Sequence, residues 1–321
     1  MQIMSQYKPR QRRLTVRNRL SIILAISLMV LLVYIIWRRE YFFPSLNDEV
    51  IDVAVILQDN VSYNSQIYSE AMEVSALNQN YNIRFSYPIT ANDAAEQLAL
   101  IRREINANND VIIIDPVDIS LLKDWNFGEA EAFILDSSLD LKNTTQISSN
   151  YNVLSDYLLD LISKHNTLDN IYLSISPSAD SEQHYFLDLI KTKLEDIAEY
   201  EISILSSTER IDASASAQTN SIYIAFDSAA AEYLFSDNRR IATFANTTVY
   251  ALEYNPNIIQ HLKSGYIDAI IAEDYYGLAN LALESISSDD ASQEMTLPAR
   301  VITSENVDIF SNEIYLYPLF Y

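Results

Sequence analysis

The stretch of residues 92–118, NDAAEQLALIRREINANNDVIIIDPVD, joins an amphipathic helix to a buried strand. Apolar residues recur every three or four positions along its first half, which predicts a helix over 92–106. Residues 111–114 form a continuous apolar run that ends at Asp115 and Pro116. Such a run is typical of a strand covered on both faces, and therefore of a parallel sheet.

The same alternation of strand and helix continues on both sides of this stretch. Short β-branched runs predict further strands at 51–58, 81–87, 132–135, 170–175, 201–205, 221–226, 241–245, 267–272 and 299–303. Helical spacing of apolar residues predicts helices at 65–78, 153–164, 182–197, 229–235, 257–264 and 276–287. The alternation predicts an α/β fold with doubly wound parallel sheets, and about 270 residues are enough for two lobes.

The N-terminal segment differs sharply in charge from the rest of the chain. Residues 1–39 hold eight Lys and Arg and no acid, whereas the remainder holds 13 basic and 44 acidic residues, a net charge of −31. The run LSIILAISLMVLLVYIIW at 20–37 has no charge and, at about 27 Å as a helix, is long enough to cross a bilayer. More cations precede the run than follow it, so the positive-inside rule places its N-terminal side in the cytoplasm.

We therefore expect a single-pass protein of the cell membrane. Its parts would be a basic cytoplasmic tail at 1–19, a transmembrane signal-anchor helix at 20–37, a linker at 38–50 and an extracytoplasmic domain at 51–321. A cleaved signal peptide is the main alternative, but the apolar run is long for one and no small-x-small cleavage site follows it. A buried core helix would not explain the flanking arginines.

Composition excludes several classes of function. The chain has three glycines, far apart, and no cysteine, so it has no glycine-rich nucleotide loop, no disulfide and no thiolate metal site. Its net charge of −23 argues against binding nucleic acid. None of the three histidines lies in an HExxH or GxSxG context, so we expect no enzyme, no cofactor and no metal site.

Four stretches together resemble the type I periplasmic binding proteins, the ribose-binding-protein-like family. They are VAVILQDNVSYNSQIYSEAMEVSALNQNYNI at 53–83, the stretch at 92–118 quoted above, SGYIDAIIAEDYYGLANLALESI at 264–286 and ARVITSENVD at 299–308. The resemblance implies two α/β lobes joined by three crossings, with a ligand bound between them. The crossings would fall near 137–141, 273–274 and 303–306. One lobe would then comprise about 51–138 and 274–302, and the other 139–273 and 303–321.

Polar residues at the ends of predicted strands are the candidates for a binding site, because ligands collect at the carboxyl ends of parallel strands. They are Asn60, Asp115, Asp136, Ser137, Asp227 and Asn246, with Tyr63 close to the first. Paired oxygens and amides beside an aromatic ring suit sugar hydroxyls. The resemblance implies ligand contacts for Asn60, Tyr63, Asp136, Asp227, Asn246 and Glu273, the last where the family has a hinge Gln.

The sequence departs from the family in charge. Ser137 stands where the family often has an arginine, and the stretch SADSEQHYF at 178–186 offers only His184 in place of another. An acidic cleft of this kind would prefer a neutral polyol or a cation to an anion. Helix capping alone would explain an Asn or Asp at several of these positions. A cation site that joins Asp59 to Asp136 and Glu273 is a weaker alternative.

The resemblance implies an extracytoplasmic solute-binding protein that closes its lobes on a small ligand, a sugar or polyol. The expected partner is either the permease of an ABC importer or a membrane sensor histidine kinase. The alternative is a cell-envelope protein-interaction domain whose ligand cleft is degenerate.

Overall fold

The computed structural model describes residues 24, 26–31, 33–34, 50–77, 79–137, 141–165, 167–197, 201–206, 220–235, 247–286 and 294–318. The chain divides into two units, residues 1–49 and 50–321. In the first unit the described positions, all between 24 and 34, are helical and exposed. Most of the expected span at 20–37 lies outside the described residues, as do the expected tail at 1–19 and nearly all of the linker. Within the described part of the chain, no helix meets the length and apolarity needed to span a membrane.

Two six-stranded sheets form the second unit. The first has the order β11-β5-β4-β3-β1-β2 and all its pairs are parallel. Its strands are β1 (Ile51–Ile56), β2 (Tyr81–Ser86), β3 (Val111–Ile114), β4 (Glu131–Leu135), β5 (Thr145–Ser149) and β11 (Glu294–Leu297). Helices α3 (Tyr63–Ala76), α4 (Ala94–Asn106) and α11 (Tyr275–Ser285) pack on it, and the short η1 (Ile119–Leu122) follows β3. We call this assembly the first lobe.

The second sheet has the order β12-β10-β9-β8-β6-β7, parallel except for β12 against β10. Its strands are β6 (Asn170–Ile175), β7 (Glu201–Ser206), β8 (Ser221–Ala225), β9 (Thr247–Ala251), β10 (Ala269–Ala272) and β12 (Arg300–Thr303). Its helices are α5 (Tyr151–Ser163), α6 (Ser181–Ile197), α8 (Ser228–Phe235), α10 (Pro256–Lys263) and α12 (Phe310–Leu316). This assembly is the second lobe, so the expected α/β fold with two parallel-dominated sheets is confirmed.

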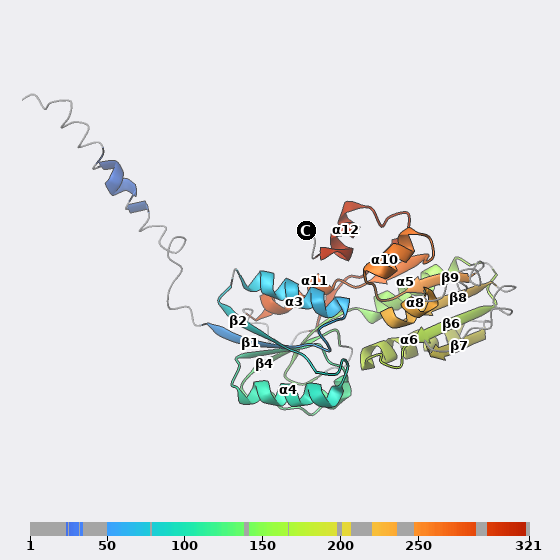
Figure 1. Cartoon of the computed structure of the whole chain (residues 1–321), viewed down its shortest axis with the longest axis horizontal. Helices are drawn as coiled ribbons and strands as arrows, with labels where there is room; N and C mark the ends of the chain where they lie inside the picture. The colour runs from blue at the N-terminus through green and yellow to red at the C-terminus, as the bar shows by residue number, and fades with distance from the viewer. Residues whose placement is uncertain are drawn as a thin grey trace, which may run out of the picture. The chain divides into compact units, whose positions relative to one another are not determined.

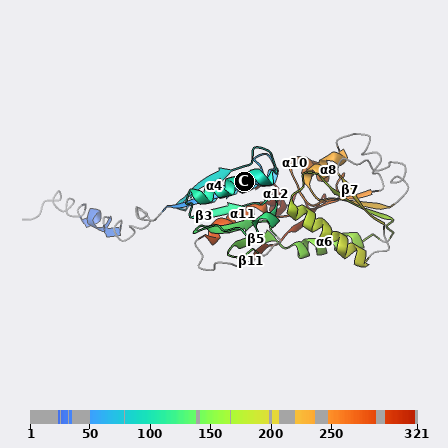
Figure 2. The same ribbon diagram turned by 90° about the horizontal axis from the view of Figure 1, so that it is seen from below.

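Each sheet is covered on both faces, as its continuous apolar strands predict. In β1, Val53 and Val55 face the core beneath α3 and α11, whereas Ala54 and Ile56 face the core beneath α4. All four are fully buried. Figure 1 shows α3 and α11 on one side of the first sheet and α4 on the other. Figure 2 shows α6 and α8 on opposite sides of the second sheet.

The chain passes between the sheets at 150, 273–274 and 298–299. The middle crossing lies where the resemblance placed it. The first comes later than 137–141, because β5 adds to the first sheet beside β4 before the chain leaves it. The third comes earlier than 303–306, because β11 belongs to the first sheet and β12 pairs with β10 in the second. The boundaries between the two lobes therefore lie at 150, 273–274 and 298–299.

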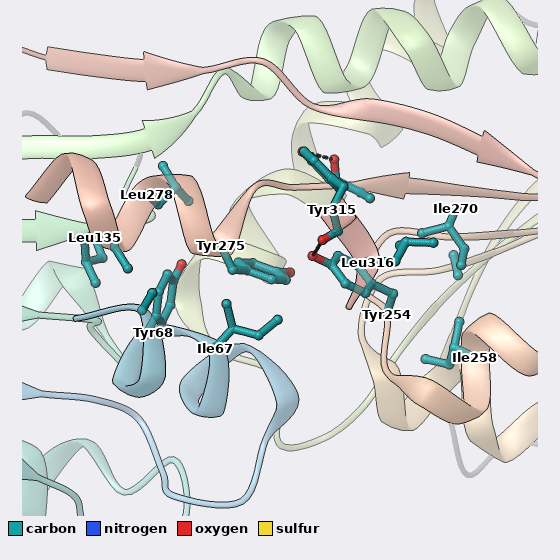
Figure 3. Packing of buried hydrophobic residues seen from close by; sticks show 14 of the residues in the cluster. Ile67, Tyr68, Leu135, Tyr254, Ile258, Ile270, Tyr275, Leu278, Tyr315 and Leu316 are labelled. Carbon is teal, nitrogen blue, oxygen red and sulfur yellow. Dashed lines mark hydrogen bonds between the residues drawn. The ribbon is translucent and has the colours of Figure 1, made fainter. Parts of the chain in front are cut away.

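One apolar cluster joins the lobes on the side of the crossings. Tyr68 of α3 meets the ring of Tyr275, at the start of α11, with centroids 5.7 Å apart. The ring of Tyr275 stacks in turn on Tyr254 of the second lobe at 5.5 Å. Figure 3 shows these rings in a row, with Tyr315 and Leu316 from α12 beside them. We call Tyr63, Tyr68, Tyr254, Tyr275 and Tyr315 the hinge tyrosines.

Candidate functional site

A small cavity lies between the lobes at the carboxyl ends of the strands. Its lining residues come from both lobes: Gln58, Asn64, Asp136, Tyr151, Asp180, Glu182, Gln183, Phe186, Phe226, Leu252, Glu253, Glu273 and Tyr275. The centre of a water-sized sphere can occupy about 30 Å³ of it. That volume suits one or two water molecules or one small polar group, and it is well below the volume of a typical ligand pocket.

Four hydrogen bonds connect the lobes near the start of α6, and the first of them joins two residues of the cavity lining. They are Gln58 Nε2 to Asp180 Oδ2 at 2.9 Å, Asn92 Nδ2 to the Ser178 carbonyl at 2.8 Å, the Ile119 N–H to Ser181 Oγ at 3.0 Å and the Ser181 N–H to the Val117 carbonyl at 3.1 Å. Each donor and acceptor pair takes one partner from each lobe. The structure is therefore that of a closed form, in which the first turn of α6 touches the loops after β1 and β3.

The cavity is acidic. Five of its lining residues carry carboxyl groups and none carries a cationic side chain: the acids are Asp136, Asp180, Glu182, Glu253 and Glu273. Burial raises the pKa of Asp180 to about 6 and, together with the charge of Asp227, that of Glu253 to about 8. Because burial and like charges both disfavour ionisation, part of this cluster holds protons at neutral pH.

Asp136 and Glu273 form a carboxyl pair within the cavity. The two groups share a hydrogen bond, and Asp136 Oδ1 also accepts one from the Tyr151 hydroxyl at 2.8 Å. Burial first and Asp136 second raise the pKa of Glu273 well above its ordinary value, so Glu273 keeps the shared proton. The backbone of Asp136 has a positive φ of 45°, an uncommon conformation for a residue with a side chain.

The loop after β1 brings a different residue to the cavity from the expected Asn60. Asp59 is buried and its Oδ1 accepts the N–H groups of Val61 and Ser62 at 2.7 and 2.6 Å. Asn60 is exposed and does not line the cavity. Gln58, two residues earlier, enters the cavity instead and donates to Asp115 Oδ1 at 3.1 Å as well as to Asp180. Asp115 itself is buried but lies outside the cavity lining.

Tyr63 belongs to the hinge tyrosines rather than to the cavity. Its hydroxyl donates to the Leu316 carbonyl at 2.9 Å, and its ring meets Tyr254 edge-on with centroids 6.0 Å apart. Burial first, and Tyr317 second, raise the pKa of Tyr63 to about 12. The side chain therefore stabilises the contact of α3 with the second lobe.

Two of the expected site residues lie beside the cavity without lining it. Asp227 accepts the Ser176 N–H on Oδ2 at 2.6 Å and the Ala230 N–H on Oδ1 at 2.8 Å, so it caps α8. Ser137 is buried next to Asp136. Helix capping, left open from the sequence, accounts for Asp227, whereas Asp136 and Glu273 do line the cavity.

Asn246 falls outside the described residues, as does the strand expected at 241–245. The described strand of this region is β9, Thr247–Ala251. Its carboxyl end brings Leu252 and Glu253 to the cavity. The run TTVYA has three β-branched residues in five and IATFA at 241–245 has two, and the prediction took the earlier run.

Sequence reasoning missed the contribution of α6. Asp180, Glu182, Gln183 and Phe186 all line the cavity and all lie within SADSEQHYF, the stretch noted only for lacking an arginine. The stretch follows β6 and begins a helix. Ligands collect at the carboxyl ends of parallel strands, so this position could have been predicted. His184, the candidate from this stretch, is exposed and points to a separate surface groove that contains Asp118 and Tyr185.

Aromatic rings form one wall of the cavity. Phe186 lies 5.3 Å from Tyr151 and 5.9 Å from Phe226, measured between ring centroids. Carboxylates and amides in the same cavity can bind hydroxyl or amino groups, while such rings can cover an apolar face of a bound molecule. Among the described residues, no group of three or more His, Asp or Glu side chains is placed to hold a metal ion.

Comparison with solved structures finds the same architecture in sugar-binding proteins. An ABC transporter solute-binding protein from Agrobacterium vitis with bound D-fucose has a TM-score of 0.71 and 16% identity, covering 83% of this chain and 100% of that one. One from Bacillus halodurans C-125 with bound myo-inositol has a TM-score of 0.66 and 16% identity, covering 84% and 100%. GanP, a glucose-galactose binding protein from Geobacillus stearothermophilus, has a TM-score of 0.68 and 12% identity, covering 82% and 100%.

No family model matches the sequence, and the search of curated proteins gave no match. At 12–16% identity the structural similarity establishes the fold. The chain has the fold of the type I periplasmic binding proteins, so the resemblance seen in the four stretches of sequence is confirmed at that level. The similar structures are solute-binding proteins, not enzymes.

Proposed function

We propose that this protein is a membrane-anchored, extracytoplasmic solute-binding protein that closes its two lobes on a small, carbohydrate-like ligand. The observation that supports this most is the cavity between the lobes, whose lining combines carboxylates and amides with aromatic rings. The fold agrees with it, because similar structures hold myo-inositol, D-fucose and other sugars.

Ligand binding would drive closure because both lobes supply lining residues. Gln58, Asn64 and Asp136 come from the first lobe, whereas Tyr151, Glu182 and Glu253 come from the second. A ligand that touches both sets binds the closed form more tightly than the open form, and this difference in affinity shifts the population toward closure. The lobes must open further than in this structure to admit a sugar-sized molecule.

The anchor is proposed from the uncharged run at 20–37 and the cations that precede it. Protease added outside intact cells should then degrade the domain at 51–321 and leave a short membrane-bound fragment. Full protection of the domain in intact cells, with degradation after lysis, would contradict the proposed orientation.

Two uses of the closed form remain open to experiment: delivery of the ligand to an ABC permease, and signalling to a sensor histidine kinase. The similar structures of ABC transporter proteins support the first. Genes for a permease and an ATPase beside this one would favour import. Genes for a kinase and a response regulator would favour sensing.

The small volume of the cavity supports a second candidate, a cell-envelope interaction domain with a degenerate cleft. About 30 Å³ is available, and the lobes already bond to each other through Gln58 and Asp180. In that case the closed form would be permanent, and the surface rather than the cleft would carry the function.

Thermal unfolding of the full-length chain in detergent separates the two candidates. The probes are D-fucose, myo-inositol, D-galactose and their amine-bearing counterparts. A ligand present at about 100 times its Kd should stabilise the folded state by about 2.7 kcal/mol. A shift with any probe supports solute binding, and no shift across the whole panel favours the degenerate cleft.

A further inference from the structure

Glu273 is a buried acid of the cavity with one carboxyl oxygen unpaired within the described part of the chain, although the group shares a hydrogen bond with Asp136. Glu273 is only 7% exposed, and its Oε2 has no hydrogen-bond partner among the described residues. A buried carboxylate oxygen without a donor is strongly unfavourable, so such an atom indicates that something else supplies the donor. Glu273 lines the cavity, which places this oxygen where a ligand would lie.

The neighbouring acids differ from Glu273 because protein groups already donate to them. Asp180 Oδ1 accepts the Gln183 N–H at 2.8 Å, and its Oδ2 accepts from Gln58. Glu253 accepts from the Gln183 side chain on Oε1 and from the Ser228 N–H on Oε2 at 2.8 Å. Unlike Asp180 and Glu253, Glu273 therefore still has an oxygen without a donor from the described residues, beside Asp136.

We propose that the ligand of this cleft carries a protonated amine, and that the ammonium group binds between Glu273 and Asp136. The proposal rests on the solute-binding function proposed above and specifies its ligand class. An ammonium group has three N–H donors and a positive charge, so it can donate to both carboxylates and neutralise the pair. A sugar hydroxyl can supply one donor but no charge.

The size and surroundings of the cavity agree with this ligand. A volume of about 30 Å³ accommodates an amine headgroup in the closed form, without a whole sugar ring. The aromatic wall of Tyr151, Phe186 and Phe226 is suited to the carbon skeleton attached to the amine. No lysine, arginine or histidine lines the cavity to compete for the acids.

Binding of an amine should release a proton. The groups that face Glu273 are acids and phenols from the surrounding elements: Tyr68 of α3, Asp136 after β4, Tyr151 of α5, Asp180 and Glu182 at the start of α6, Glu253 and Tyr254 after β9, Tyr275 of α11 and Tyr315 of α12. With no cation among them, the pair keeps its proton until a positive ligand arrives. An ammonium group favours the ionised form, so the proton leaves as the ligand binds.

Isothermal titration calorimetry of the full-length chain tests the proposal with matched probes. One pair is D-galactosamine and D-galactose, which differ by an amine in place of a hydroxyl, and a simpler pair is ethanolamine and ethylene glycol. We expect an amine to bind at least tenfold more tightly than its hydroxyl partner. The heat should also depend on the ionisation enthalpy of the buffer, because a proton is released.

Two variants and a control locate the effect. Glu273→Gln should weaken amine binding at least tenfold and abolish the dependence on buffer, while affinity for the hydroxyl probe changes less than threefold. Asp136→Asn, which keeps the shape of the side chain, serves as the second variant and should weaken amine binding as well. Glu73→Gln removes an exposed acid of α3 and should change nothing.

The outcomes separate this proposal from the function on which it rests. Equal or tighter binding of the hydroxyl probes would overturn the amine proposal and leave solute binding intact. Binding of no probe from either class would overturn both. Amine binding that survives in both Glu273→Gln and Asp136→Asn would overturn the placement of the ammonium group.

Discussion

The hinge tyrosines and the acidic cavity are two adjoining contacts between the same lobes, and they are built in opposite ways. At the hinge, rings pack on rings and the hydroxyls of Tyr254 and Tyr315 donate to the carbonyls of Glu273 and Ala272 at 3.1 and 3.0 Å. In the cavity, acids face acids, and Glu273 Oε2 has no partner among the described residues. Ring packing thus dominates the hinge, where among the described residues only the Tyr68 hydroxyl of the hinge tyrosines is buried without a partner, whereas the cavity keeps an acidic oxygen that a ligand could satisfy.

The hinge side should show the largest loss of stability on mutation. Tyr254→Ala removes a ring that is 2% exposed and stacked on Tyr275, so we expect it to lower the free energy of unfolding by about 3–5 kcal/mol. Urea-induced unfolding measures the change. Tyr157→Ala, at a ring of α5 that is 37% exposed, is the control and should cost less than about 1 kcal/mol. Similar losses of unfolding free energy in the two variants would show that the packing of Tyr254 at the hinge is no more stabilising than that of Tyr157.

The cavity side should make stability depend on pH. Glu253 has an ordinary value of 4.5 and a pKa of about 8 in the folded protein, so between these values the folded state binds more protons than the unfolded state. The free energy of unfolding should therefore fall as pH rises through this window, by up to about 1.4 kcal/mol per pH unit for this group. Below pH 4.5 the group is protonated in both states and its contribution is complete.

Glu253→Gln provides the matched test of this pH effect. The variant cannot ionise at this position, so its unfolding free energy should fall less steeply between about pH 5 and pH 8 than that of the natural chain. Chemical denaturation at a series of pH values measures the difference. A parallel pH profile in the variant would show that Glu253 is ionised throughout and that the cavity is more hydrated than its burial indicates.

The backbone conformation of Asp136 should have a smaller effect on the free energy of unfolding. Both Asp136→Gly and Asp136→Ala lose the hydrogen bond from Tyr151, but only glycine adopts a φ of 45° without steric cost. We expect the alanine variant to be less stable than the glycine variant by about 1 kcal/mol. Unfolding of the two variants side by side measures this difference. Equal stabilities would mean that the backbone relaxes at no cost.

The smallest predicted effect is on the equilibrium between the open and closed lobes. Ser181→Ala removes the Oγ that accepts the Ile119 N–H across the lobes, which should weaken the closed form by about 1 kcal/mol, or roughly fivefold in the ratio of closed to open molecules. Energy transfer between dyes attached to the two lobes reports that ratio. Ser163→Ala, whose exposed hydroxyl donates within α5, is the control. An unchanged distance distribution in Ser181→Ala would show that the hinge alone sets the angle between the lobes.

The sequence predicts most of the fold, because the strongest elements have clear periodicity. The strand expected at 170–175 coincides with β6, and most of the other strands and helices agree within two residues. The strands β5 and β11, TQISS and EMTL, were missed. They are short and largely polar, and they become strands because each pairs with the other along the edge of the first sheet.

The site was predicted less completely than the fold. Asp136, predicted because it directly follows a buried strand, and Glu273, predicted from the resemblance, both line the cavity. Asp180 and Glu253 depend on how a loop or a strand register places them, and the sequence does not specify either. The contact of Gln58 with Asp180 depends on the angle between the lobes, which no local pattern encodes.

The third crossing consists of only residues 298 and 299, between β11 at the edge of one sheet and β12 at the edge of the other. Two residues reach about 7 Å at full extension, so this link has no slack to absorb a separation of the lobes. We expect opening to rotate the lobes about this link, which would turn the two border strands against each other. A membrane partner that contacts β11 and β12 would detect a bound ligand through the relative rotation of these two strands, without reaching the interior of the cleft.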